Sequence, residues 1–256
     1  MAAKYRGSLF SGPGSSVSAV KSRLDPLFWA LFALTVLVFA FEIGFVFLKV
    51  PEAQPGAGGI AQKIFYFHVP AAYAMYLSGT VGFLASALYL YGATDHRDAW
   101  AKAGAECAVC FGSLVLTSGP LWAKKAWGVY WTFDPRLTTL LLTVLIYAAV
   151  VMLRVFGGSG EAERRFAAAL TVLGTITLPI VHYSVQKWGG NHPTVITKGG
   201  GGLGDPNMKL ALGIGFFAMT LLAALLLWMR ARLNHAASRL DAAEEAAAAA
   251  GIGEPT

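Results

Sequence analysis

Six apolar stretches constrain this chain more than any other feature of its sequence. A helix needs roughly 20 consecutive apolar residues to cross the hydrocarbon core of a bilayer. The stretches lie at 26–48, 69–91, 103–121, 137–156, 166–186 and 209–229. Composition agrees, because 56% of the 256 residues are hydrophobic and only 13% are charged, against about 25% charged in soluble domains. The sequence therefore predicts an all-α integral membrane protein with six transmembrane helices, and it excludes soluble enzymes and disulfide scaffolds.

The distribution of Lys and Arg favours one orientation in the membrane. Six spans place both termini and the even-numbered connections on one side. That side holds 12 of the 20 Lys and Arg residues and the other side holds 8, and cytoplasmic loops carry the excess of basic residues. We therefore expect cytoplasmic N and C termini, with residues 1–25 as a disordered cytoplasmic lead, 26–230 as the membrane domain and 231–256 as an Ala-rich cytoplasmic tail. No basic stripe accompanies the net charge of +6, so nucleic acid is not an expected partner.

The chemically unusual residues gather in the three connections on the outer side. The middle one, 122–136, carries five aromatic residues within 12 positions, followed by an acid and a base. These residues are Trp122, Trp127, Tyr130, Trp131, Phe133, Asp134 and Arg136. An aromatic belt at the lipid interface would explain the rings alone. Rings beside a carboxylate and a guanidinium also suit a flat, apolar ligand with anionic edges.

Two histidines flank this connection on the same side of the membrane. His68 precedes Pro70, near which the second span is expected to begin because proline is tolerated in the first helical turn. Residues 60–67 have the pattern of a short interfacial helix leading into it. His192 follows the fifth span, and His182, inside that span, is a weaker candidate ligand. A lone interfacial histidine is typically a polar surface residue, but two neutral imidazoles can occupy both axial positions of a haem iron.

Other polar residues within the spans favour structural roles. Cys107 and Cys110 form a C-x-x-C in the third span without the following His of a covalent haem site, which favours two small buried side chains. Glu42 has no evident partner, and intramembrane acids are often functional. Glu106 is expected to extend to the interface or to pair with Lys102.

The outer connections resemble those of a known family. The segment at 127–137, WGVYWTFDPRL, is similar to the tryptophan-rich "WWD" signature of haem-handling proteins in cytochrome c biogenesis. The segments around His68 and His192 resemble those around the two axial histidines of the CcmC family, which delivers haem in the cytochrome c maturation system. The resemblance covers roughly 24–230. Tyr130 and Phe133 stand where the family usually has Trp, and both keep a ring face for stacking.

The resemblance implies a haem-binding and delivery protein rather than an enzyme, located in the bacterial inner membrane. It implies a b-type haem, carried as cargo on the periplasmic side, with His68 and His192 as axial ligands. The expected aromatic platform is Trp122, Trp127, Tyr130, Trp131 and Phe133, with Asp134 and Arg136 as orienting residues. Arg136 or Lys63 would pair with the propionates. The haem would pass to the chaperone CcmE, with CcmA, CcmB and CcmD as further complex partners.

Two other functions are compatible with parts of the sequence. A transporter that moves haem or another solute by itself would need a polar path through the membrane, to which the spans contribute little besides Glu42. A thiol-disulfide carrier would use Cys107 and Cys110 as its redox pair. For a haem-delivery protein, arrival of haem from the lipid, from the cytoplasm or by way of CcmB are all compatible with this pattern.

Overall fold

The computed structural model is a helical bundle in which residues 26–54, 58–158, 160–193 and 202–251 are described. The predicted lead at 1–25 lies outside these residues. The elements are α1 (Pro26–Leu48), η2 (Gly59–Ile64), α2 (Phe65–Tyr91), α3 (Asp95–Trp127), α4 (Pro135–Phe156), α5 (Glu161–Thr175), α6 (Thr177–Trp188) and α7 (Pro206–Ala249). Six helical stretches are long and apolar enough to cross a membrane, and the described residues contain no strand. The predicted class of six-span helical membrane protein is confirmed.

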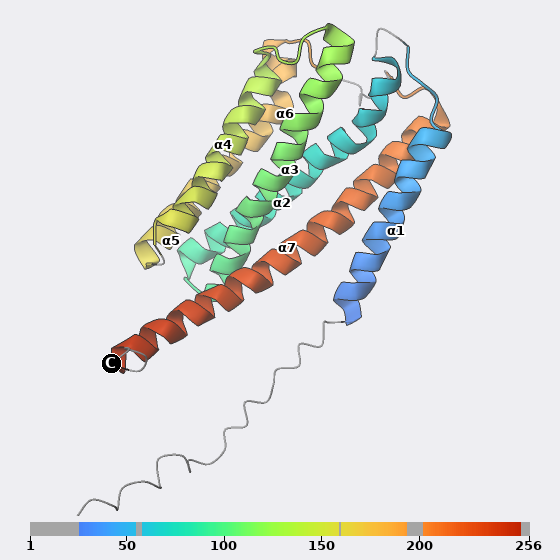
Figure 1. Ribbon diagram of the computed structural model, residues 1–256. Coiled ribbons are helices and arrows are strands. Elements are labelled where there is room, and N and C mark those ends of the chain that lie inside the picture. Colours follow the sequence, from blue (N-terminus) through green and yellow to red (C-terminus); the bar gives the residue numbers. More distant parts are fainter. Residues whose placement is uncertain (1–25, 55–57, 159, 194–201, 252–256) are drawn as a thin grey trace, which may run out of the picture.

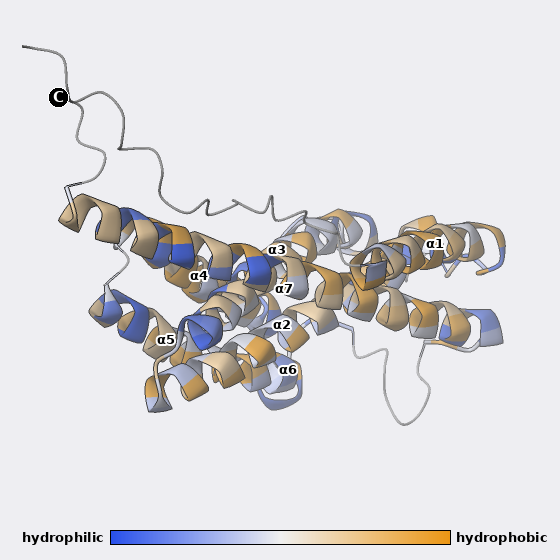
Figure 2. Cartoon of the chain, turned by 90° about the horizontal axis from the view of Figure 1, so that it is seen from below, coloured by the Kyte–Doolittle hydropathy of each residue, from blue (hydrophilic) through white to orange (hydrophobic). Residues whose placement is uncertain are grey.

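The two ends of the bundle carry different connections. The histidine end, at the top of Figure 1, comprises η2, residues 128–134 between α3 and α4, and residues 189–193 after α6. The arginine end comprises the connections from α2 to α3 and from α4 to α5. Figure 2 shows hydrophobic residues along much of the helices, and large apolar side chains such as Leu37, Leu84 and Leu145 are exposed. A helix surface of this kind is suited to contact with lipid.

Glycines let α2 and α3 pack closely against each other. A Cβ atom added to Gly104 of α3 would lie 2.3 Å from the Cα atom of Gly82 in α2. Small residues allow membrane helices to approach until their backbones touch, which provides van der Waals contact where lipid removes the hydrophobic driving force. The same two helices carry His68 and Ser118 at their other ends, so this contact fixes the helix spacing beneath the histidine end.

The helices extend beyond the apolar stretches that predicted them. α3 begins at Asp95, where the Thr94 side chain accepts a hydrogen bond from the Arg97 backbone N–H at 3.3 Å. It ends at Trp127, because Gly128 adopts a left-handed φ of 79°. The expected outer connection at 122–136 is therefore shorter, since its first six residues are helical. Hydropathy marks the bilayer core, whereas a helix continues until a capping residue stops it.

The second and fifth spans also differ in detail from the prediction. The short helix expected within 60–67 is present as η2, but α2 follows it directly from Phe65, so Pro70 lies inside the helix and not at its start. The fifth span is divided at Ile176 into α5 and α6. Pro179 explains this division, because it has no N–H to donate to the carbonyl of Thr175 and its ring crowds that carbonyl.

The last helix joins the sixth span to the predicted tail. α7 begins after Asp205, whose carboxylate accepts a hydrogen bond from the Asn207 N–H at 2.7 Å, with Pro206 as the first helical residue. The helix runs on to Ala249 without a break at residue 231. The Ala-rich composition favours this continuation, because alanine has the highest helix propensity. α1 packs mainly against α7, beside which it lies in Figure 1.

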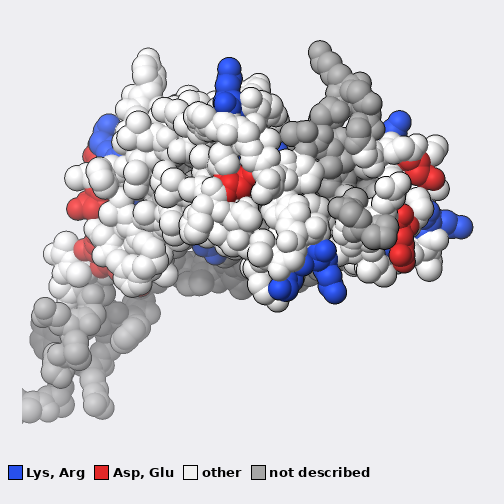
Figure 3. All heavy atoms as spheres, turned by 90° about the horizontal axis from the view of Figure 1, so that it is seen from above, with Lys and Arg blue, Asp and Glu red and all other residues white. Residues whose placement is uncertain are grey.

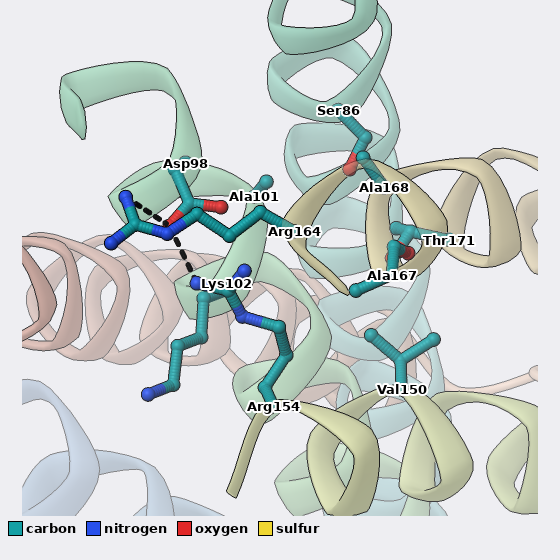
Figure 4. Close-up of a pocket in the computed structure, with 10 residues that line it drawn as sticks. All are labelled: Ser86, Asp98, Ala101, Lys102, Val150, Arg154, Arg164, Ala167, Ala168 and Thr171. Atoms are coloured by element: carbon teal, nitrogen blue, oxygen red, sulfur yellow. Dashed lines mark hydrogen bonds and ion pairs between the residues drawn. The ribbon is translucent and has the colours of Figure 1, made fainter. Parts of the chain in front are cut away.

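A buried ion-pair network joins three helices at the arginine end. Asp98 of α3 is 5% exposed and accepts a hydrogen bond from Arg154 of α4 at 2.5 Å. Arg164 of α5 lies 3.8 Å from the same carboxylate and 3.0 Å from that of Asp95. Figure 4 shows Asp98, Arg154 and Arg164 around a small hollow that Ser86 also lines. The network ties α3, α4 and α5 together at the end of the bundle opposite the histidine end.

Glu106 pairs with α7 and not with Lys102 as expected. Its two carboxylate oxygens accept hydrogen bonds from Arg230 at 2.7 and 2.9 Å, and one also accepts from Asn234 at 3.0 Å. The sequence predicted that Glu106 extends to the interface or pairs with Lys102, which lies one helical turn away. Packing of α7 on α3 supplies a bidentate guanidinium instead, which is the stronger partner for a carboxylate.

We predict that Asp98→Ala destabilises the protein strongly. The substitution leaves the nearly buried Arg154 guanidinium without its carboxylate, and loss of one member of a buried ion pair costs ~3–5 kcal/mol. Unfolding followed by circular dichroism in mixed micelles measures the effect. Glu161→Ala is the matched control, because its pair with Arg165 is exposed and such pairs contribute about 0–1 kcal/mol. Equal effects of the two substitutions would contradict this account.

Candidate functional site

His68 lies in the first turns of α2, with its imidazole against α3. Its Nδ1 atom is 2.8 Å from the Ser118 hydroxyl, and that hydroxyl itself donates to the Leu114 carbonyl at 2.6 Å. Because the hydroxyl proton is used in this way, the Ser118 oxygen is left as the acceptor and Nδ1 of His68 carries the ring proton. A Cβ atom on Gly119 would lie 3.2 Å from Cε1 of the ring. The ring is therefore held on α3, with the lone pair of Nε2 left available.

Asp134 connects the start of α4 to the segment that carries His192. It is the N-cap of α4, where its Oδ1 atom accepts from the Arg136 backbone N–H at 2.8 Å. Its Oδ2 atom accepts from the backbone N–H groups of Asn191 at 2.7 Å and His192 at 3.2 Å. The carboxylate is 6% exposed, and several N–H donors satisfy it, as a buried charge requires. This one side chain fixes the position of the His192 backbone.

Two glycines allow the chain to wrap around the Asp134 carboxylate. Gly189 and Gly190 have φ angles of 72° and 132°, which favour glycine over residues with a side chain. A Cβ atom on Gly190 would lie 2.1 Å from Oδ2 of Asp134. The Gly-Gly-Asn segment is thus what brings the Asn191 and His192 amides onto the carboxylate.

The His192 imidazole is held in one protonation form. Its Nδ1 atom is 3.1 Å from the Pro193 carbonyl oxygen and 3.4 Å from an Arg136 nitrogen. The contact with the carbonyl requires Nδ1 to donate a hydrogen bond, whereas the contact with Arg136 requires it to accept one. We assign the proton to Nδ1, because the contact with the carbonyl is shorter and a carbonyl can only accept. The lone pair of Nε2 is then available, as it is in His68.

Burial and a nearby cation keep the His192 ring neutral. Desolvation by burial, and then the Arg136 charge, lower the pKa of His192 from the usual 6.5 to about 4. The imidazole is therefore uncharged at neutral pH, which is the form that binds a metal ion. The His68 and His192 rings are close enough to interact electrostatically. The fold thus brings together two histidines from opposite halves of the chain.

Arg136 and Lys63 differ in what they offer to an anion. Arg136 donates to the His182 carbonyl at 2.8 Å, and its buried Nε atom has no hydrogen-bond partner among the described residues. Lys63 is 9% exposed and donates to the Phe47 carbonyl at 3.1 Å, near the end of α1. Arg136 is therefore the better placed of the two candidate cations. The His182 side chain is exposed and packs edge-on against Tyr183.

The five predicted aromatic residues form two groups. Trp122 and Trp127 lie on the last turns of α3, with ring centroids 5.2 Å apart and planes at 81°, and Trp122 donates to Gln62 of η2 at 2.9 Å. The other three lie on the connection that follows. Tyr130 and Phe133 are 58% and 87% exposed, and Trp131 is half-buried. The first group attaches η2 to α3, and the second presents rings at the surface.

Sequence inspection missed the residues that orient the proposed ligands. Ser118 sets the proton of His68, and Gln62 binds the Trp122 indole. A hydroxyl in an otherwise apolar span was a signal for Ser118, whereas nothing in the sequence pairs Gln62 with a residue on α3. The cysteines also differ from the prediction: Cys107 is buried as expected, but Cys110 is exposed on the face of α3, and both are free thiols.

The end of the molecule that carries these residues is only sparsely charged. Figure 3 shows it from above, with most of the surface uncharged and the Lys and Arg groups confined to a few small patches. The described residues contain no group of three or more His, Cys, Asp and Glu that could hold a metal ion. The fold and site together define a multi-pass membrane protein that carries two histidines and several exposed aromatic rings at one end of its bundle.

Comparison with known proteins identifies the family. The profile of the CcmC family, described as haem exporter protein C, matches residues 10–246. Haem exporter protein C of Bradyrhizobium diazoefficiens is 34% identical over 206 residues, which cover 80% of this chain and 76% of that protein. The Escherichia coli K12 protein of the same name is 31% identical over 205 residues, or 79% of this chain and 80% of its own length. The Rhodobacter capsulatus protein is 30% identical over 227 residues, 87% of this chain and 91% of its own.

The chain therefore belongs to the CcmC family of haem exporter proteins, which handle haem in cytochrome c maturation. This finding confirms the resemblance that the outer connections predicted. It establishes that the chain is a multi-pass membrane protein of a family that handles haem.

We predict that Gly190→Ala releases the segment that carries His192. The added Cβ atom would force Oδ2 of Asp134 away from the Asn191 and His192 amides. Hydrogen bonds to a charged acceptor contribute ~1.5–3 kcal/mol each, so amide hydrogen exchange in this segment should become at least about tenfold faster. Mass spectrometry of the exchanged peptide measures it. Gly204→Ala is the control, because nothing lies within 4 Å of a Cβ atom there, and unchanged exchange in Gly190→Ala would refute the proposed clash.

Proposed function

We propose that this protein binds a b-type haem between His68 and His192 at the periplasmic face of the bacterial inner membrane and delivers it to the haem chaperone CcmE. The haem is cargo, and the protein acts in binding and delivery, not as an enzyme. The proposal goes beyond membership of the haem exporter family by assigning the ligands, the side of the membrane and the acceptor. CcmA, CcmB and CcmD are the proposed partners in the complex.

The observation that carries this proposal is the matched state of the two imidazoles. Each ring has its Nδ1 atom directed at an oxygen acceptor, Ser118 in one case and the Pro193 carbonyl in the other. Histidines that bind metals commonly donate the other ring N–H to such an acceptor, which fixes the ring and raises its basicity. Both Nε2 atoms are then prepared to donate a lone pair to iron, and a bis-imidazole site follows.

The surroundings of the two rings support a flat, amphipathic ligand. Exposed rings of Tyr130 and Phe133 offer faces on which a porphyrin can stack. The free Nε–H of Arg136 suits a propionate, because a guanidinium binds carboxylates through several N–H groups. The ligands come from α2 and from the segment after α6, so they hold the iron from two sides and leave a porphyrin edge accessible to an acceptor protein.

The proposed orientation rests on the basic residues. The side with the termini holds 12 of the 20 Lys and Arg, which favours a cytoplasmic arginine end and a periplasmic histidine end. The Asp98 network would then lie at the cytoplasmic interface. This placement puts the haem ligands on the side where CcmE would receive the haem.

We predict that the purified protein from haem-replete cells shows the visible spectrum of a six-coordinate, low-spin haem, and that His68→Ala and His192→Ala each weaken it. Removal of either imidazole opens an axial position, so the bands should shift and haem should be lost during purification, with ~10-fold or larger effects. Pyridine haemochrome assays measure the haem content. His96→Ala, a substitution at the arginine end, is the control and should leave the spectrum unchanged. A colourless wild type would refute the haem assignment, and unaltered variants would refute the ligands.

A second prediction separates this function from a thiol-disulfide carrier. The Cys107→Ala, Cys110→Ala variant should retain haem and should load haem onto co-expressed CcmE at the level of the wild type, because neither thiol contributes to the proposed site. Haem covalently attached to CcmE is measured by peroxidase staining of gels. Loss of CcmE loading with haem binding intact would favour the redox function instead.

A further inference from the structure

Glu42 is a buried acid within the membrane that the proposed site does not use. It is the only ionisable residue in α1 and is 1% exposed. It lies six residues before the end of the helix at Leu48, or about 9 Å along the axis. Neither of its carboxyl oxygens has a hydrogen-bond partner among the described residues. An intramembrane acid without a partner is costly and calls for a specific role.

Glu42 faces the backbone of α2 across a glycine of α7. A Cβ atom on Gly215 would lie 2.7 Å from Oε1 of Glu42, 2.6 Å from the carbonyl oxygen of Tyr66 and 2.9 Å from the ring of Pro70. The carboxyl group and the carbonyl group therefore converge on the same point. Glycine at position 215 keeps that point open, and any side chain there would separate them.

The Tyr66 carbonyl has lost its usual partner within the helix. In an α-helix it would accept a hydrogen bond from the N–H of residue 70, but that residue is proline and has no N–H. A carbonyl oxygen can only accept, and a carboxylate can only accept as well. A charged Glu42 would thus face a second acceptor, whereas a protonated Glu42 has an O–H group that can donate a hydrogen bond to this carbonyl.

We propose that Glu42 is protonated and donates its proton to the Tyr66 carbonyl, and that this hydrogen bond positions His68. Tyr66 and Pro70 lie on one side of α2, and His68, between them, lies on the other. Anchoring the Tyr66 side to α1 and α7 fixes the rotation of this part of α2. The His68 ring is thereby directed to Ser118 on α3, which determines its Nδ1 proton. Glu42 is a positioning residue that acts through the backbone, and its link to haem rests on the proposed function.

Two measurements on the haem-free protein test the hydrogen bond and its effect. Infrared spectroscopy should show the carbonyl stretch of a protonated, hydrogen-bonded carboxylic acid in the wild type and its loss in Glu42→Gln. Magnetic resonance of ¹⁵N-labelled histidine, assigned with His68→Ala, should show His68 protonated at Nδ1 in the wild type and in Glu42→Gln, whose amide can still donate to Tyr66. Glu42→Leu and Gly215→Ala should lose this single form. Thr35→Val, a buried polar substitution on the same helix, is the control.

The same variants, loaded with haem, report the consequence for binding. Glu42→Leu should retain haem about 10-fold less well than the wild type, as found when a group that orients a metal ligand is removed, and Glu42→Gln should retain it normally. Absence of the carboxylic acid band in the wild type, or a His68 signal unchanged in Glu42→Leu, would overturn the proposal. A wild type without haem would refute the proposed function only, because the infrared and magnetic resonance results need no haem.

Discussion

The rest of the histidine end depends on the hydrogen bonds that the Asp134 carboxylate accepts. It caps α4 through one oxygen and holds the Asn191 and His192 amides through the other. Without it, the backbone of the segment after α6 would lose its two hydrogen bonds to the start of α4. A charge that is 6% exposed is tolerated because N–H groups surround it, and those groups belong to the two segments that must be joined.

Further polar contacts at this end orient the two imidazoles. Ser118 and the Pro193 carbonyl each accept a hydrogen bond from an Nδ1–H group, and burial together with the nearby Arg136 charge lowers the pKa of His192. A membrane protein has few polar side chains to use, and here most of those near the surface orient another residue. A site arranged in advance by such contacts would require little reordering of the protein when a ligand binds.

The fold could be predicted from the sequence because lipid imposes a simple rule on helix length and hydropathy. The six spans were visible in this way, and their order predicted that His68, His192 and the aromatic connection lie at the same end of the bundle. The limits of the helices were less predictable, because capping residues and not hydropathy set them. Thr94 caps the start of α3, and Gly128 caps its end. The Glu106 pair with Arg230 and the Asp134 contact with His192 join residues far apart in the chain. A single sequence contains no local signal for such pairs, and only the packing of α3 on α7, or of α4 beside α6, creates them.

The position of the iron in the haem-loaded protein is the most direct test of the central claim. A single-particle map of the protein in lipid nanodiscs, with the haem resolved, measures it. Our account predicts iron within bonding distance of Nε2 of both His68 and His192, with Nδ1 of each ring still at its oxygen acceptor. Iron bound by only one of these histidines, or a haem bound elsewhere on the protein, would contradict it.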